Sequence, residues 1–229
     1  MSIIVYSAVA FHFFPLLVFF YYSNKLGKNR INILIAILVF FSFSADVISL
    51  WLANSGLNTN PISNFYQIIE RMLAVFILTR VSHISYKSKK ILIALCVLLS
   101  LYQITYCISS SFLIQNDYVK LLSSSFLCLL ALHTLFILIS NTSMGSLKID
   151  FYVWPILAIF FFMSSMLIPE MITNIDDSTE FPEYFHQMRI GVAIGSNIIR
   201  DSLFTFFFFQ AKKWIMIQVN EIYVFASIF

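Results

Sequence analysis

Three ionisable residues inside long apolar segments are the first candidates for chemistry in this sequence. Asp46 lies within Ile31–Ala53, and Glu70 and Arg71 lie within the following segment, Ser63–His83. If both segments are helices, each acid stands about seven residues from the same end, roughly 10 Å deep at 1.5 Å per residue. This equal depth predicts that the three side chains meet in one polar cluster.

Two interpretations of this cluster are open. In the first, Arg71 pairs with Asp46 or Glu70, and the pair only fixes helix packing. In the second, the three residues line a site for a small polar ligand that is open to the outside, with Gln103 near the same level and His12 slightly deeper. Ionisable groups within a membrane are expensive and usually face the bundle interior, so both interpretations place the cluster inside.

A second polar set recurs at helical spacing in the last long apolar segment, Met188–Phe209. Asn197 and Asp201 stand four residues apart, and Arg200 adjoins Asp201. This set is expected about 18 Å from the outer surface by the same rise, with His133 at a comparable depth. It is either a structural ion pair or a switch in which Arg200 and Asp201 exchange partners between two conformations.

Two glycines precede this second set by one to two turns. Gly191 and Gly195 are spaced four apart and share a helical face. Small residues at this spacing allow close helix contact in membranes. The pair therefore predicts a packing seam, and it offers a surface through which the chain could form an oligomer.

The elements that must position these residues are long apolar helices. Of the 229 residues, 60% are hydrophobic and 11% are charged, whereas a soluble domain carries about 25% charged residues. Such a chain needs lipid as its solvent, and a helix of about 20 apolar residues spans the hydrocarbon. We predict an all-α polytopic membrane protein with seven transmembrane helices, at Ile3–Tyr22, Ile31–Ala53, Ser63–His83, Ile91–Phe112, Val119–Ile139, Phe151–Ile168 and Met188–Phe209.

The basic residues orient these helices. Ten of them fall on one side of the predicted bundle, and only Lys120 and Arg189 fall on the other, which is acidic. The positive-inside rule places the ten in the cytoplasm, with the N-terminus outside and the C-terminus inside. The ten are Lys25, Lys28, Arg30, Arg80, Lys87, Lys89, Lys90, Lys148, Lys212 and Lys213.

The predicted domain organisation is simple. Residues 1–213 form the transmembrane bundle. Residues 214–229 are too short and too polar for a regular span, so we interpret them as an amphipathic segment on the cytoplasmic interface, an eighth span being the alternative. The longest connection, Pro169–Gln187, is acidic and is either a lid over an external cavity or a solvated linker.

Specific chemistry is not indicated by the remaining residues. The four histidines are scattered, so no metal site or haem is expected, and we predict no cofactor. Walker, dinucleotide-binding and GxSxG patterns do not occur in the sequence. A net charge of +3 is too small to favour nucleic acid as a partner. An enzyme therefore ranks last among the candidate functions.

One stretch resembles a known group of proteins. Ile31–Ala53 ends in a segment with Asp and Ser, an Asn-rich connection follows, and the next helix opens with Asn64-Phe65-Tyr66-Gln67-Ile68-Ile69-Glu70. This resembles uncharacterised seven-helix inner-membrane proteins of Bacteroidetes-type bacteria, which have a Tyr-x-x-Ile-Glu-like stretch there and an Asn in helix 7, here Asn197. The group often has His before the Tyr, where this chain has Asn64-Phe65. The resemblance implies a sensory partner of a separate kinase.

Three functions remain open. The first is a receptor-like or sensory protein of the inner membrane that binds a small ligand or partner from outside and signals to a membrane or cytoplasmic partner. The second is a transporter or channel for a small molecule or ion, which needs a polar path between the two polar sets. The third is a structural subunit of a membrane complex.

Overall fold

The protein is built of α-helices. The structure is a computed structural model that describes residues 3–26, 29–81, 85–114, 117–141, 152–175 and 183–226, and all regular secondary structure in these ranges is helical. The predicted all-α class is thereby confirmed. The helices are α1 (Ile3–Tyr21), α2 (Ser23–Leu26), α3 (Arg30–Asn54), α4 (Asn60–Val81), α5 (Tyr86–Ser110), α6 (Asp117–Asn141), α7 (Val153–Ile175) and α8 (Glu183–Ala226).

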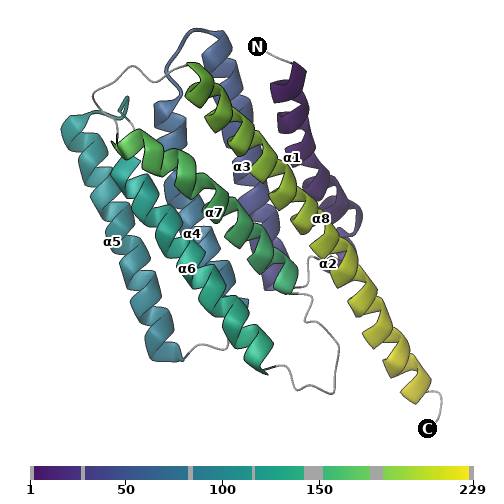
Figure 1. Cartoon of the computed structure of the whole chain (residues 1–229). Helices are drawn as coiled ribbons and strands as arrows, with labels where there is room; N and C mark the ends of the chain where they lie inside the picture. The colour runs from purple at the N-terminus through teal and green to yellow at the C-terminus, as the bar shows by residue number, and fades with distance from the viewer. Residues whose placement is uncertain are drawn as a thin grey trace.

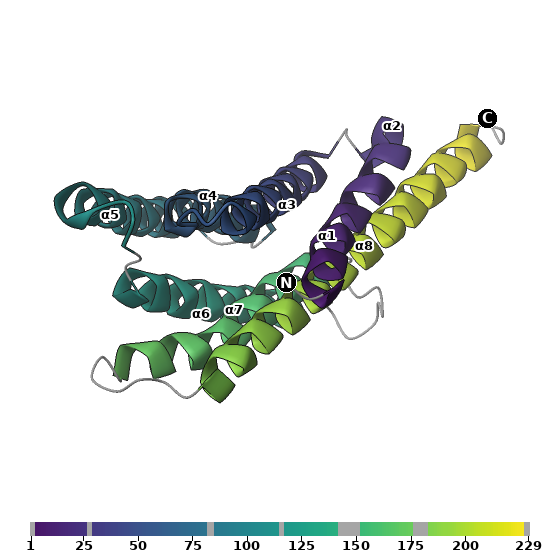
Figure 2. The same cartoon turned by 90° about the horizontal axis from the view of Figure 1, so that it is seen from above.

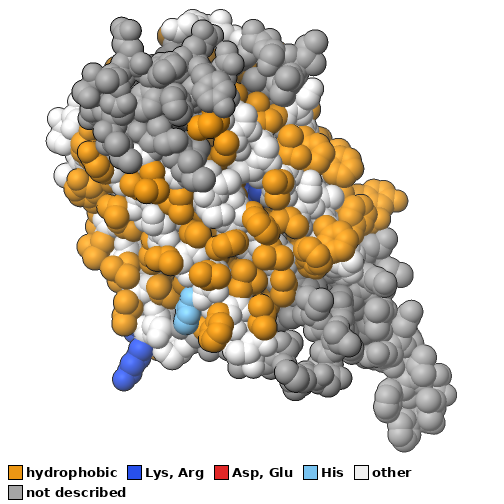
Figure 3. Space-filling view, in the orientation of Figure 1, with side chains coloured by type: hydrophobic (Ala, Val, Ile, Leu, Met, Phe, Trp, Pro, Cys, Tyr) orange, Lys and Arg blue, Asp and Glu red, His pale blue; other side chains and the backbone are white. Residues whose placement is uncertain are grey.

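Several helices have the length and composition that a bilayer requires. Four segments of the described chain are long and apolar enough to cross a membrane, namely Arg30–Asn54, Tyr86–Ser110, Asp117–Ser140 and Ile190–Ala211. Shorter apolar stretches occupy Tyr6–Tyr21 and Val153–Leu167. Hydrophobic side chains also cover much of the outer face of the bundle (Figure 3). These features are those of a membrane protein, because a soluble surface does not leave so much apolar area in contact with water.

The long helices form a ring with one helix outside it. Packing contacts run from α1 to α3, α3 to α4, α4 to α6, α6 to α7, α7 to α8 and α8 back to α1. Helix α5 packs on the outer side of α4 and meets α6 only slightly. Seen from above, α3, α4 and α5 form one row, and α6, α7 and α8 lie across from them (Figure 2). The ring leaves an interior into which five helices can direct polar side chains.

The α3–α4 connection is shaped by a glycine at the end of α3. Gly56 has a φ of +70°, the left-handed conformation that glycine adopts without strain. Its N–H donates to the carbonyl of Ala53 (3.1 Å), and the N–H of Leu57 donates to that of Leu52 (2.9 Å). This paired arrangement is a Schellman motif, which satisfies the last carbonyls of a helix and reverses the chain. It brings α4 back beside the face of α3 that carries Asp46.

Helix α8 is longer than the sequence pattern predicts. We expected a helix at Met188–Phe209 and a separate segment at 214–229, but α8 runs unbroken from Glu183 to Ala226, over 44 residues. At 1.5 Å per residue it is roughly 66 Å long, about twice the thickness of the hydrocarbon core. Helix α8 therefore extends beyond the rest of the bundle (Figure 1). The position of residues 214–226 relative to a bilayer stays a prediction, and residues 227–229 lie outside the described residues.

The predicted connection Pro169–Gln187 is largely helical. Helix α7 continues to Ile175 and α8 begins at Glu183, so that only residues 176–182 separate them. Those seven residues lie outside the described part of the chain. Apolar periodicity underestimated both helices because their ends are polar, and helix formation there depends on continuation from a stable neighbour.

The glycine seam predicted on α8 is wrong for packing within the chain. A Cβ added at Gly191 or at Gly195 would meet no described atom within 4 Å. Gly191 is exposed and Gly195 is half-buried, and no side chain that the structure describes packs closely against either. Their part in an oligomer stays a prediction.

We expect the double substitution Gly191→Ala and Gly195→Ala to leave the monomer as stable or to stabilise it. Alanine fits the space, and each replacement within a helix is worth about 0.5–1 kcal/mol in its favour. Thermal unfolding in detergent, where the monomer is isolated, measures this effect. A clear drop in the unfolding temperature would contradict the open environment of the two glycines.

Candidate functional site

A histidine between two carboxylates joins three helices of the ring. His12 of α1 places its Nε2 atom 2.8 Å from Oδ2 of Asp46 on α3, and its Nδ1 atom 2.5 Å from Oδ2 of Asp201 on α8. The side chains of His12 and Asp201 are 2% and 1% exposed, whereas that of Asp46 is 38% exposed. We call these three residues the His12 triad. Asp46 is its accessible member.

The imidazole of His12 lies within ion-pair distance of both acids. Oδ2 of Asp201 has no hydrogen-bond partner among the described residues, and Nη2 of Arg200 lies 3.3 Å from Nδ1 of the same imidazole. A neutral imidazole carries one N–H, so it can donate to only one partner at a time. Loss of either contact with an acid would break one of the links between α1 and its neighbours.

Arg200 connects this triad to the other acid of the ring. Its Nη2 donates to Ser42 Oγ at 2.7 Å. The carboxylates are more distant, with Nε at 3.4 Å from Asp201 Oδ1 and Nη1 at 3.5 Å from Glu70 Oε1. The guanidinium also lies over the ring of Phe162, 4.3 Å from its centroid, a favourable cation–π contact. Arg200 is thus buried and pairs loosely with two acids.

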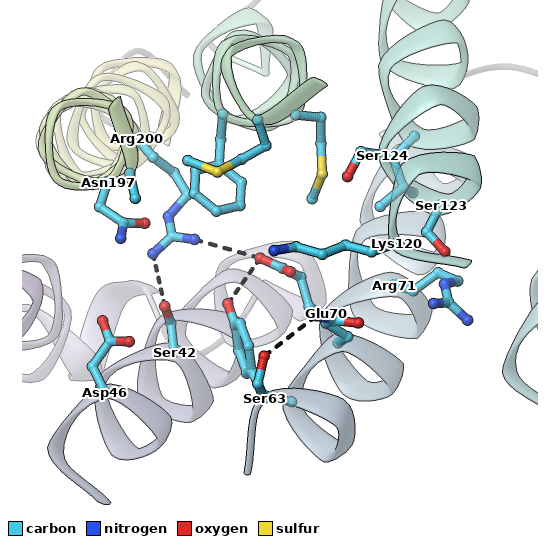
Figure 4. A pocket seen from close by; sticks show the side chains of 17 residues that line it. Ser42, Asp46, Ser63, Glu70, Arg71, Lys120, Ser123, Ser124, Asn197 and Arg200 are labelled. Carbon is cyan, nitrogen blue, oxygen red and sulfur yellow. Dashed lines mark hydrogen bonds and ion pairs between the residues drawn. The ribbon is translucent and has the colours of Figure 1, made fainter. Parts of the chain in front are cut away.

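Glu70 is held in place from its own helix. The hydroxyl of Tyr66, one turn earlier on α4, donates to Glu70 Oε1 at 2.8 Å. The Glu70 side chain is 13% exposed. Figure 4 shows Lys120 of α6 extending toward this carboxylate from the side opposite to Arg200.

The two polar sets expected at different depths form one network. The prediction placed Arg200 and Asp201 several ångströms deeper than Asp46 and Glu70, and the structure joins both sets through His12 and Arg200. Long side chains bridge residues at different levels of the bundle, so an offset counted along the helices does not keep two polar sets apart. The depth of each set within a bilayer stays a prediction.

Arg71 does not pair with either acid, which corrects the first interpretation of the cluster. Its Nη2 donates to Gln103 Oε1 at 2.7 Å, and its Nη1 donates to Ser100 Oγ at 3.3 Å, both on α5. Gln103 in turn donates to the carbonyl of Asn64 and to Gln67 Oε1. Arg71 is 1% exposed. It therefore anchors α5 to α4, and Gln103 belongs to this anchor.

A cavity lies between the charged residues and α7. Its volume is about 170 Å³, and α3, α4, α6, α7 and α8 all contribute to its wall. We call it the central cavity. Its lining includes residues near the start of α4 and of α6, so it occupies the end of the bundle where these two helices begin. Its polar wall consists of Ser42, Asp46, Ser63, Tyr66, Gln67, Glu70, Arg71, Lys120, Ser123, Ser124, Asn197 and Arg200, and its apolar wall of Leu127, Phe162, Met163, Met166 and Ala193.

A second cavity lies on the other side of Asp46, between α1, α3 and α8. It measures about 320 Å³ and is lined by both His12 and Asp46. Asp46, Ala193 and Asn197 line both cavities. Asn197, which was expected beside the switch pair, therefore stands on the partition between them. The accessible member of the His12 triad faces both spaces.

The network leaves out one residue that the sequence analysis selected and includes two that it did not select. The side chain of His133 is exposed on α6 and takes no part in the network. Tyr66 and Lys120 were not selected from the sequence. Tyr66 stands four residues before Glu70, on the same face of the helix, so its spacing could have identified it. Lys120 was counted only as a charge at a helix end.

Among the described residues, no group of three or more His, Cys, Asp and Glu side chains is arranged to hold a metal ion.

No protein-family model, no curated protein and no solved structure matches this chain. The resemblance of the segment around Glu70 to seven-helix inner-membrane proteins stays a prediction.

We expect His12 and Asp201 to be energetically coupled. His12→Gln and Asp201→Asn should each destabilise the protein by roughly 3–5 kcal/mol, since each breaks a buried charged contact. The double variant should lose at least about 1 kcal/mol less than the sum of the two. Unfolding in detergent measures all three, with Ser202→Ala as a control at an exposed position of α8. If the losses in unfolding free energy of the two single variants were strictly additive, this would contradict the contact between His12 and Asp201.

Proposed function

We propose that the protein is a receptor-like sensory protein of the inner membrane whose ligand, a small polar molecule, binds in the central cavity. The observation that carries this proposal is the lining of the cavity. Buried side chains of both charges surround a space large enough for a small molecule. Such groups are costly within a membrane and mark functional sites by default.

The apolar core favours a receptor over an open pore. Phe204, Phe207 and Phe208 follow Arg200 along α8, and all three are fully buried. Ile77 and Leu78 similarly follow Glu70 along α4 and are fully buried. These side chains lie on the far side of the charged network and close off the interior there. A ligand in the central cavity would meet a dead end, which suits a binding site.

The proposed topology has seven spans, α1 and α3 to α8, with the N-terminus outside. Helices α1, α4 and α6 end at one end of the bundle, near which α3, α5 and α7 begin (Figure 1). The basic residues near these ends, together with Lys212 and Lys213 of α8, would lie in the cytoplasm by the positive-inside rule. The central cavity would then open toward the outside.

The signal would leave through α8. Arg200 and Asp201 contact the network from this helix, which continues for a further 25 residues to Ala226. A ligand that changes their partners would shift α8 relative to α1 and α3. A membrane or cytoplasmic partner bound near the end of α8 would register the shift, as the resemblance to sensory partners of kinases also implies.

Transport is the second candidate, and one observation favours it. The His12 triad places an imidazole and two carboxylates beside two cavities, which is an arrangement suited to coupling proton and substrate movement. It requires a second conformation in which the apolar core opens. Uptake of substrate into proteoliposomes without any partner would favour this candidate. A role as a subunit of a membrane complex stays a prediction.

The topology predicts which ends of the helices can be labelled from outside the cell. The variant Ser55→Cys, at the end of α3, should react with a membrane-impermeant thiol reagent in intact cells. The variant Ser85→Cys, at the start of α5, should react only after the cells are opened. Both positions are exposed in the structure. The parent chain, with Cys96, Cys107 and Cys128, is the background control, and equal labelling of both variants in intact cells would contradict the topology.

If a ligand binds in the central cavity, the variant Glu70→Gln should lose affinity for it. A panel of amino acids, carboxylates, amines and polyols is tested for its effect on the unfolding temperature of the protein in nanodiscs. At least one compound should stabilise the parent chain, and Glu70→Gln should bind it about tenfold or more weakly, because a charged hydrogen bond is worth about 1.5–3 kcal/mol.

Two outcomes would contradict the proposal. One is that no compound in the panel stabilises the parent protein. The other is that Glu70→Gln, when folded, binds the stabilising compound as the parent does. Ser202→Ala should bind it normally, since Ser202 is exposed away from the cavity.

A further inference from the structure

We propose that the ligand of the central cavity is a small zwitterion with an apolar body, such as an amino acid. Its carboxylate would bind Arg200 and its ammonium group would bind Glu70. This inference rests on the proposed function and specifies the chemistry of the same site.

The ion pair between Arg200 and Glu70 is the first argument. Its N···O distance is 3.5 Å, whereas charged hydrogen bonds of this kind normally measure 2.7–2.9 Å. The other carboxylate contact of Arg200, with Asp201, is also long at 3.4 Å. The shortest contacts of both partners are with hydroxyls, Arg200 with Ser42 at 2.7 Å and Glu70 with Tyr66 at 2.8 Å. The two charges are therefore positioned independently, and a ligand can separate them without releasing either side chain.

The presence of both signs of charge is the second argument. Acidic Asp46 and Glu70 and basic Arg71, Lys120 and Arg200 share the wall of one cavity. A ligand with only a carboxylate or only an ammonium group would give a partner to Arg200 or to Glu70 and leave the other without one, which is costly away from water. A zwitterion offers a partner to each half of the loosened pair.

The geometry of the two charges sets the shape of the ligand head. Arg200 Nη1 and Glu70 Oε1 lie close to each other in the wall of the cavity. The opposite charges of the ligand must therefore also lie close together, as they do when both groups are attached to one carbon atom. A guanidinium binds a carboxylate through two parallel hydrogen bonds. A carboxylate can accept from any of the three N–H bonds of an ammonium group.

The apolar residues of the wall explain the apolar body. Leu127 of α6 and Phe162, Met163 and Met166 of α7 form an apolar part of the cavity wall. Methionine side chains are flexible and adapt to apolar groups of different shape. The volume of about 170 Å³ limits the ligand to a small molecule. A polyol or sugar would leave the charges unmatched and would place hydroxyl groups against this apolar wall.

The test measures the binding of three probes with the same branched apolar group to the parent protein in nanodiscs. The probes are leucine, 4-methylpentanoate, which lacks the ammonium group, and 3-methylbutylamine, which lacks the carboxylate. Isothermal titration calorimetry should show leucine, or another apolar amino acid tested alongside it, binding at least about tenfold more tightly than either truncated analogue.

The variant Glu70→Gln makes the test specific. It should weaken leucine toward the affinity of 4-methylpentanoate while it leaves the affinity of 4-methylpentanoate unchanged or improved, because only the ammonium group loses its partner. The matched control is Asp117→Asn, which removes a carboxylate from α6 that does not line the cavity. This control should bind all three probes as the parent does.

Three results would overturn the inference. If a truncated analogue binds as tightly as the amino acid, one of the two charges is not recognised. If a polyol, a simple anion or an amine stabilises the protein and no amino acid does, the cavity still binds a small polar ligand and the proposed function stands, but the zwitterion is wrong. If no compound of any class binds, both fail together.

Discussion

The contact of His12 with Asp46 and Asp201 is the constraint on which the interior of this protein depends. In a bundle surrounded by lipid, apolar side chains gain little by packing against each other instead of against lipid, so polar contacts contribute much of the specificity between helices. The His12 triad joins α1, α3 and α8 through one side chain. Arg200 then extends the same network to α4 through Glu70. Four of the seven long helices are thus positioned by charges that none of them satisfies alone.

This network also divides the interior into two parts. Toward the beginning of α4 and α6, the ring encloses the two cavities, with Asp46 and Asn197 between them. On the other side, the phenylalanines of α8 pack into a dry core. The division follows from the free-energy cost of burying a charge. A buried charge needs either a partner or water, and only the open end of the bundle provides both. The separate anchor of Arg71 on Gln103 keeps α5 attached without drawing a charge from the site.

Much of the helical architecture could be predicted from apolar segment lengths, and the polar residues that form the site could be selected by their spacing. Their pairing could not be predicted. Glu70 and Arg71 are adjacent in sequence, and adjacent residues of a helix point about 100° apart, so Glu70 meets Arg200 of α8 whereas Arg71 binds Ser100 and Gln103 of α5. Depth counted along the chain also did not reveal that the set of Arg200 and the set of Asp46 form one network. Helix tilt and rotation are set by neighbours that the sequence of one segment does not reveal.

The unbroken course of α8 makes it a mechanical lever with its fulcrum at the charged network. From Asp201 to Ala226 the helix spans 25 residues, roughly 38 Å. If α8 pivots about Asp201 by about 5°, its far end is displaced by about 3 Å over that length. A rearrangement as small as the exchange of one ion-pair partner would therefore be magnified several-fold at the opposite end of the molecule. No additional domain would be needed to convey it there.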